Sequence, residues 1–251
     1  MKIAVCGKGG CGKSTVSALL AKCMAKKGNK VLVVDIDESN YGLHSHLGLD
    51  MPETLIDHFG GKKEYGKKMQ AAREEQRNSI FDRKWKIGDI PSDLIASKGG
   101  IKLISVGKIQ DFGEGCACPL GSLSRQFFEN LELNDNEVVI ADTEAGIEHL
   151  GRSIERGFDF ILIIVDPSYE SLRLSKKIED ITKDNVGKAY IVLNRVEDGV
   201  KDIMMGSLDK DKVAAIIPVN KDLFKASLAG KEFDSDIREI DGLAEFLINN
   251  N

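Results

Sequence analysis

Seven short apolar runs recur along the chain, and they restrict the possible folds more than any other feature of the sequence. They are "KIAVCG" from Lys2, "KVLVVD" from Lys30, "IKLISV" from Ile101, "EVVIAD" from Glu137, "FILIIVD" from Phe160, "AYIVLN" from Ala189 and "VAAIIPV" from Val213. Their residues are mostly β-branched or aliphatic, and polar residues do not alternate with them. This pattern is typical of central strands in a parallel sheet that is covered on both faces.

Helical patterns lie between several of these runs, at residues 13–27, 122–131, 168–183 and 240–248. Strands that alternate with helices indicate βαβ units. We therefore predict an α/β fold with a mostly parallel, doubly wound sheet of about seven strands flanked by helices. Because the 251 residues contain no linker or internal repeat, we expect one domain over 1–251.

The range 62–90 interrupts this alternation. It is highly charged and contains Trp85, the only tryptophan of the chain. We interpret it as a helical insertion on the outside of the fold. Its charges indicate a solvated face, and a surface that docks a partner is the alternative.

Composition restricts the partners and the cellular location. The net charge of -5 gives no basic footprint for nucleic acid, and no apolar run reaches the length of a membrane span. The N-terminus becomes polar too early for a signal peptide, and the five cysteines without one favour a reducing compartment. We expect a cytoplasmic protein that binds neither nucleic acid nor a membrane.

The first apolar run leads directly into "GKGGCGKST", residues 7–15. This stretch fits G-x-x-x-x-G-K-[ST] between a predicted strand and a predicted helix, which is the context of a phosphate-binding P-loop. Lys13 is expected to reach the β- and γ-phosphates of ATP, and the Ser14 hydroxyl to bind Mg²⁺. Residues assigned to this ATP and Mg²⁺ site are Gly7, Gly9, Gly10, Cys11, Gly12, Lys13, Ser14 and Thr15.

Carboxylates follow two of the predicted strands. Asp35 and Asp37 end the segment "VVDID", and Asp142 ends "EVVIAD". Parallel α/β sheets bind ligands at the carboxyl ends of their strands, where carboxylates can organise Mg²⁺ and an attacking water. For Asp35 or Asp37 taken alone, an Asx turn that ends the strand is the alternative.

The second lysine of the loop, Lys8, gives G-K-G-G-x-G-K-S-T, and the chain resembles the deviant Walker A ATPases. That family includes the nitrogenase iron protein, septum-positioning and plasmid-partition ATPases, and several metal-cluster maturation factors. The resemblance covers nearly the whole chain except 62–90. It implies a slow, switch-like ATPase that forms a homodimer around its nucleotides, with Lys8 contacting phosphates held by the partner subunit. It also implies that Asp37 positions the water, that Asp35 supports Mg²⁺ and that Asp142 is the Walker B carboxylate.

The resemblance assigns further contacts to the nucleotide. "DTEAGIEHLGR" resembles the family's switch II, in which Gly146 would sense the γ-phosphate. "VLNR" places Asn194 and Arg195 where the family's asparagine reads adenine. "IIPVN" resembles the segment beside the base, with Pro218 and Val219 as contacts.

Two close cysteines, Cys116 and Cys118 in "GEGCACPLG", remain to be explained. Two thiolates do not fill a tetrahedral shell, but one pair from each subunit of a dimer supplies four, which suits Zn²⁺ or Ni²⁺. Within the family, the order "GKGGCGKST", "CACP", "DTEAGIEHLGR" most resembles the CooC-type nickel-insertion ATPases. That resemblance implies a metallochaperone whose client is carbon monoxide dehydrogenase or acetyl-CoA synthase. The alternative is a loop pair without a metal role, either two small half-buried residues or a reducible disulfide-like pair.

A dimer stabilised by a purely structural Zn²⁺ is an alternative to nickel delivery, and two other functional classes also stay open. One is a septum-positioning or partition ATPase, which does not require a Cys-x-Cys pair. The other is an iron–sulfur protein of the nitrogenase iron protein type, whose cluster is held by two well-separated cysteines per chain. We expect Cys6, Cys11 and Cys23 to be structural. His44 and His46 are expected on a short helix as ordinary surface histidines.

Overall fold

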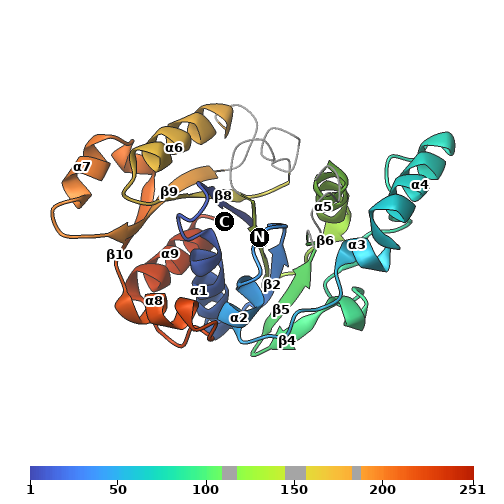
Figure 1. Cartoon of the computed structure of the whole chain (residues 1–251), viewed down its shortest axis with the longest axis horizontal. Helices are drawn as coiled ribbons and strands as arrows, with labels where there is room; N and C mark the ends of the chain where they lie inside the picture. Colours follow the sequence, from blue (N-terminus) through green and yellow to red (C-terminus); the bar gives the residue numbers. More distant parts are fainter. Residues whose placement is uncertain (109–117, 145–156, 183–187) are drawn as a thin grey trace.

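An eight-stranded sheet forms the centre of the computed structural model, which describes residues 1–108, 118–144, 157–182 and 188–251 (Figure 1). The strand order is β10-β9-β8-β1-β7-β2-β5-β4. The strands are β1 (Lys2–Gly7), β2 (Lys30–Asp35), β4 (Ala96–Lys98), β5 (Ile101–Ser105), β7 (Glu137–Asp142), β8 (Phe160–Val165), β9 (Lys188–Val196) and β10 (Val213–Pro218).

The seven apolar runs of the sequence form seven mutually parallel strands, which confirms the predicted fold class. The sheet nevertheless has eight strands rather than about seven. The additional strand is β4, which pairs antiparallel with β5 at the edge of the sheet. Its three residues "ASK" are partly or fully exposed, so no apolar run marks it in the sequence. A separate two-stranded sheet joins β3 (Trp85–Lys86) to β6 (Leu131–Glu132).

Helices cover both faces of the main sheet (Figure 1). Neighbouring residues of β1 belong to different cores: Ile3 and Val5 pack on one face, and Ala4 and Cys6 on the other. The first face carries α1 (Lys13–Lys26), α2 (Leu43–Leu47), α8 (Lys221–Leu228) and α9 (Arg238–Asn249). The second carries α3 (Leu55–His58), α4 (Gly61–Glu74), α5 (Cys118–Asn130), α6 (Tyr169–Thr182) and α7 (Lys201–Gly206). In the part of the chain that the structure describes, no helix has the length and apolarity needed to cross a bilayer.

The charged range 62–90 contains most of α4, which lies at the outer margin of the molecule (Figure 1). The helix ends at Glu74, and turns, β3 and irregular segments follow it. One side of α4 is buried: Gln126 of α5 donates a hydrogen bond to the Tyr65 hydroxyl at 2.8 Å. Trp85 packs edge-on against Phe81. The range therefore combines a solvated charged face with an apolar face that joins the second core.

His46 corrects the expectation of two surface histidines, because it is only 7% exposed. Its ring stacks on Phe233 with centroids 4.1 Å apart, and the Phe233 amide donates to the His46 carbonyl at 3.0 Å. The spacing of Leu43, His46 and Leu47 places all three on the same face of α2, the face that packs on the core. His44 is half-buried.

Leu20 tests the packing of α1 between the sheet and α9. Its side chain is fully buried, so truncating Leu20→Ala leaves a cavity and is expected to cost about 2–5 kcal/mol of unfolding free energy. The matched control is Leu228→Ala on α8, where the side chain is 80% exposed and the expected change is within about 0.5 kcal/mol. Urea unfolding without nucleotide measures both. Equal losses in the two variants would contradict the described packing.

His46 also predicts a pH dependence of stability. Burial lowers the pKa of the His46 imidazole to about 4 from its usual value of 6.5, so the folded protein holds this ring neutral. The stabilisation that comes from keeping the His46 ring neutral is complete above pH 6.5. It is lost as the pH falls from 6.5 through about 4. His46→Phe keeps the ring stack on Phe233 but cannot take up a proton. We expect a smaller loss of stability from pH 7 to pH 5 in the variant than in the wild type, by urea unfolding; equal losses would argue against a buried neutral imidazole.

Candidate nucleotide-binding site

The loop between β1 and α1 requires glycine at two positions. Gly12 has a φ of 99°, and a Cβ there would lie 2.2 Å from Nδ2 of Asn194. Gly7 has a φ of 145°, and a Cβ would lie 2.4 Å from the carbonyl oxygen of Ile164. Both the backbone conformation and the close approach exclude larger side chains. The loop thus presents its backbone without side chains in the way, as phosphate binding requires.

Side chains at the end of β9 hold the loop in this shape. Asn194 donates from Nδ2 to the carbonyl of Cys11 at 2.8 Å, and Arg195 donates from Nη1 to the carbonyl of Gly10 at 2.8 Å. Burial raises the pKa of the Cys11 thiol to about 11, which keeps it protonated. A protonated, buried thiol agrees with the structural role expected for Cys11.

The two lysines of the loop occupy different positions. Lys13 is 5% exposed, and its ammonium donates to the carbonyl of Lys8 at 3.2 Å, so it lies along the inside of the loop. Lys8 itself extends to the rim, where its ammonium lies 3.4 Å from the Ser168 hydroxyl and 3.4 Å from the Glu170 carboxylate. The enclosed cation at Lys13 suits a phosphate chain, while Lys8 is partly open to solvent.

Asp142 at the end of β7 is joined directly to the start of α1. Its buried carboxylate accepts hydrogen bonds from the hydroxyls of Ser14 at 2.5 Å and Ser17 at 3.0 Å. Burial raises the pKa of Asp142 to about 6, against the opposing effects of Ser14, Lys13 and Ser17. The structure therefore brings two of the three residues assigned to Mg²⁺, Ser14 and Asp142, into contact.

The segment that follows β2 also contacts Ser14. Asp37 accepts from the Ser39 amide at 3.0 Å and from the Ser39 hydroxyl at 2.7 Å, which is an Asx turn. Asn40 donates from Nδ2 to the Ser14 hydroxyl at 2.6 Å. Sequence analysis did not identify Asn40, and no motif marks it.

Lys108 is the most informative residue that sequence analysis missed. It is 5% exposed, and its ammonium lies 2.7 Å from Asp35 Oδ2, 2.5 Å from the Asp37 carbonyl and 2.5 Å from the Asn40 carbonyl. The parallel pairing of β5 with β2, which puts Ser105 opposite Asp35, indicates that the residues just beyond these two strand ends lie close together. A cation just beyond the end of β5 therefore reaches a carboxylate at the end of β2.

The oxygen atoms at this sheet edge fit Mg²⁺, which prefers hydroxyl, carboxylate and water ligands. Besides Ser14 and Asp142, Asp35 contributes a carboxylate whose Oδ1 is buried and has no hydrogen-bond partner among the residues that the structure describes. Burial raises the pKa of the Asp35 carboxyl to about 7, while Lys108 opposes this rise. A divalent cation that uses this orphaned oxygen would lower that pKa further.

A pocket of about 430 Å³ lies beside the loop, between the ends of β9 and β10 and helix α8. All four residues predicted to contact the base line it, together with Thr15 in the first turn of α1. The described lining also includes two exposed apolar side chains of α8. The residues discussed here are Thr15, Asn194, Arg195, Pro218, Val219, Phe224 and Leu228.

Two predicted site residues, Gly146 and Cys116, lie outside the described residues. Cys118 is the first residue of α5, is exposed and is disulfide-bonded in the structure, whereas Cys6, Cys11 and Cys23 form no disulfide. Within the described ranges, no group of three or more His, Cys, Asp or Glu residues is arranged to hold a metal ion.

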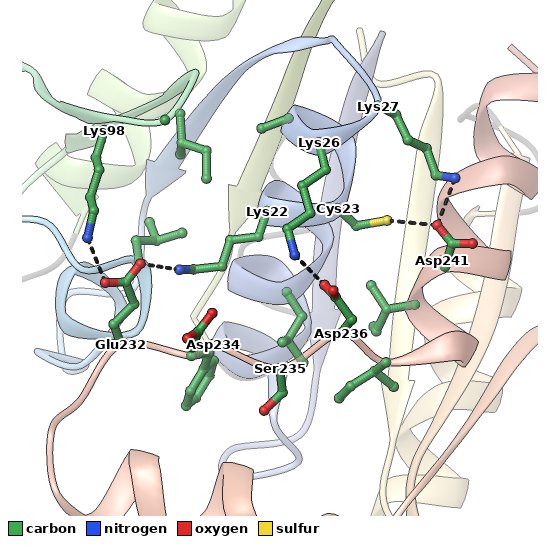
Figure 2. A pocket seen from close by; sticks show the side chains of 18 of the residues that line it. Lys22, Cys23, Lys26, Lys27, Lys98, Glu232, Asp234, Ser235, Asp236 and Asp241 are labelled. Carbon is green, nitrogen blue, oxygen red and sulfur yellow. Dashed lines mark hydrogen bonds and ion pairs between the residues drawn. The ribbon is translucent and has the colours of Figure 1, made fainter.

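A second pocket, of about 870 Å³, lies between α1 and the segment 231–237 that joins α8 to α9 (Figure 2). Lys22 pairs with Glu232 at 2.5 Å, and Lys26 pairs with Asp236. Burial and a hydrogen bond to Asp241 raise the pKa of Cys23 to about 11. The charged side chains of this pocket pair with one another, and the Cys23 thiol is protonated. We therefore interpret these contacts as structural contacts that hold the segment 231–237 against α1.

Gly12→Ala and Gly28→Ala form a matched pair that tests the loop. Both glycines have a positive φ, 99° and 90°, so alanine strains the backbone at either site by about 1–3 kcal/mol. A Cβ at residue 28 meets nothing within 4 Å, whereas one at residue 12 collides with Asn194. Losing one or more phosphate hydrogen bonds, at about 1.5–3 kcal/mol each, should weaken ATP binding at least about tenfold in Gly12→Ala alone. Calorimetric titration measures both; equal affinities would contradict the assignment of the loop.

Two curated proteins are similar to this chain in sequence. A curated ATP-binding protein of uncharacterised function from Methanocaldococcus jannaschii is 50% identical over 247 residues, which cover 98% of this chain and 99% of the relative. The carbon monoxide dehydrogenase accessory protein CooC of Rhodospirillum rubrum is 33% identical over 189 residues, 73% of this chain and 70% of the relative.

Solved structures share the fold at lower identity. The septum site-determining protein MinD of Pyrococcus horikoshii, complexed with Mg-ADP, superposes with a TM-score of 0.70 at 18% identity and covers 98% of this chain and 95% of its own. A putative plasmid partition protein of Borrelia burgdorferi, bound to AMPPNP, gives a TM-score of 0.65 at 16% identity and covers 100% of this chain and 99% of its own.

The model of the CobQ/CobB/MinD/ParA nucleotide binding domain matches residues 2–233. The chain therefore belongs to the CobQ/CobB/MinD/ParA family of P-loop nucleotide-binding proteins.

Proposed function

We propose that the protein is an ATP-hydrolysing, homodimeric metallochaperone that helps to load nickel into carbon monoxide dehydrogenase or acetyl-CoA synthase. The observation that carries the proposal is the position of exposed Cys118 at the start of α5, next to the sheet edge that holds the nucleotide site. The 33% identity to a carbon monoxide dehydrogenase accessory protein supports it. The nickel ion is the cargo, and ATP is the second substrate.

The proposed reaction transfers the γ-phosphoryl group of ATP to water and releases ADP and phosphate. Lys13, enclosed by the loop, binds the β- and γ-phosphates, and Asp37 orients the attacking water. Mg²⁺ bound near Ser14 and Asp142 would neutralise charge on the phosphates. Asn194 and Arg195 fix the loop and, with Pro218 and Val219, enclose the base.

The proposed dimer gives Lys8 and the cysteines a shared purpose. Lys8 lies at the rim of the loop with about a third of its side chain exposed, a position from which it would reach phosphates held by a partner subunit. Cys116 and Cys118 of both subunits would then supply four thiolates to one Ni²⁺ or Zn²⁺ ion. ATP binding and hydrolysis would change the contact between the two subunits, and this change would alter the affinity of the four thiolates for the metal ion.

The positioning or partition class predicts a surface for a membrane or for DNA. Helix α9 does not favour that alternative, because its first turn carries Glu239 and Asp241 and its last turn carries no basic residue. The structural likeness to MinD and to partition proteins is a likeness of fold. The iron–sulfur alternative predicts a coloured protein after anaerobic purification.

Replacing both cysteines tests the proposal. Reduced wild-type protein is expected to bind about one Ni²⁺ per dimer, and Cys116→Ser/Cys118→Ser to bind none, because serine hydroxyls are poor ligands for this ion. Cys23→Ser is the matched control, since Cys23 is a free cysteine on α1 that is fastened to Asp241; it should bind metal as the wild type does. Equilibrium dialysis with metal analysis measures the stoichiometry, and light scattering measures the mass.

Two results would overturn the metal assignment. One is equal nickel binding by the wild type and the double variant, and the other is no binding by either. In both cases the positioning class becomes the better candidate, and co-sedimentation with anionic lipid vesicles is the next assay.

A further inference from the structure

Lys108 gives every hydrogen of its ammonium group to the segment 35–40. Lysine has three donors, and the three acceptors are the Asp35 carboxylate and the carbonyls of Asp37 and Asn40. Lysine is rarely buried unless it is paired in this way. The position of Lys108 therefore depends on the conformation of that segment, and the segment depends on Lys108.

The same segment touches the magnesium ligands on its other side. Asn40 accepts from Lys108 with its carbonyl and donates from its side chain to the Ser14 hydroxyl. That hydroxyl oxygen has two lone pairs, one of which accepts from Asn40, and Mg²⁺ bound at the other would withdraw electron density from the oxygen and so weaken the hydrogen bond from Asn40. A change at Ser14 thus reaches Lys108 through one residue.

The chain next to Lys108 supports the start of α5. A Cβ on Gly107 would lie 2.7 Å from Leu120 Cδ2 and 2.8 Å from Ile56 Cγ2, so the first turn of α5 rests directly on this backbone. The adjoining residue is also fixed, because the Val106 amide donates to the Asp35 carbonyl at 2.9 Å and its carbonyl accepts from the Ile56 amide at 2.9 Å. A shift of Gly107 toward α5 would therefore press on Leu120 in the first turn of that helix.

We propose that Lys108 is a positioning residue that transmits the state of the nucleotide site to the start of α5, where Cys118 lies. The route runs from Ser14 through Asn40 to Lys108, and from Gly107 to Leu120. The inference rests on the proposed function in assigning Cys118 to the cargo site. Because coupling between two sites is reciprocal, cargo at Cys118 also alters nucleotide affinity.

The test measures alkylation of Cys118 by iodoacetamide in the reduced full-length protein, with peptide mass spectrometry as the readout. Rates are compared at saturating Mg-ADP and at saturating Mg²⁺ with a non-hydrolysable ATP analogue. We expect the wild-type rates in the two states to differ by about fivefold or more. In Lys108→Met their ratio should fall to about one. Lys102→Met is the matched control, because Lys102 lies on β5 and donates to the Ile87 carbonyl at 3.4 Å; it should keep the wild-type ratio.

Three further variants keep the test decisive if Lys108→Met fails to fold around the unpaired Asp35. Lys108→Met/Asp35→Asn removes both buried charges, and calorimetric titration first verifies that it still binds Mg-nucleotide, because Asp35 is also a proposed Mg²⁺ ligand; Gly107→Ala disturbs the contact with Leu120 without changing any charge. In both variants the Cys118 alkylation rates in the two nucleotide states should become equal. Lys108→Arg, which keeps the cation, should retain part of the wild-type difference.

An equal rate in the two wild-type states overturns the inference, and so does a wild-type ratio in folded Lys108→Met or in the double variant. The thiol readout needs no metal. If the ratio responds as expected but the protein binds no nickel, the coupling stands and the proposed function fails.

Discussion

Hydrogen bonds from the ends of β7 and β9 hold the phosphate loop, and the rest of the site depends on them. Asn194 and Arg195 fix the carbonyls of Cys11 and Gly10, and Asp142 fixes Ser14 at the start of α1. A loop with glycine at its turning points has little conformational preference of its own, so these contacts supply its shape. Two of these contacts also explain why the base pocket adjoins the loop, because Asn194 and Arg195 line that pocket.

The buried ion pair of Lys108 and Asp35 is better explained by switching than by stability. The desolvation free energy of burying two charges is about as large as the free energy of their mutual attraction, so a buried ion pair is weak evidence for a stabilising role. What the pair does is fix one arrangement of 35–40 against the strand end at 105–108. A competing arrangement induced at Ser14 then breaks several bonds together, which favours two discrete states over a gradual change.

Much of the fold could be predicted from sequence because seven buried parallel strands give seven continuous apolar runs, which periodicity detects. The three-residue β4 is partly or fully exposed and escapes that signal. The phosphate loop could be predicted because its spacing has a mechanical reason. Lys108, Asn40 and Ser17 could not, because they act through contacts between segments distant in sequence. His46 was misjudged because a histidine in a short helix resembles a surface residue unless its apolar neighbours are considered.

The most direct test of the account is X-ray absorption at the zinc edge of the reduced protein loaded with one Zn²⁺ per two chains. A site shared across the dimer by two Cys-x-Cys pairs predicts four sulfur neighbours at about 2.3 Å. A shell of two sulfurs completed by nitrogen or oxygen, or a shell without sulfur, would contradict the shared four-thiolate site on which the proposed function depends.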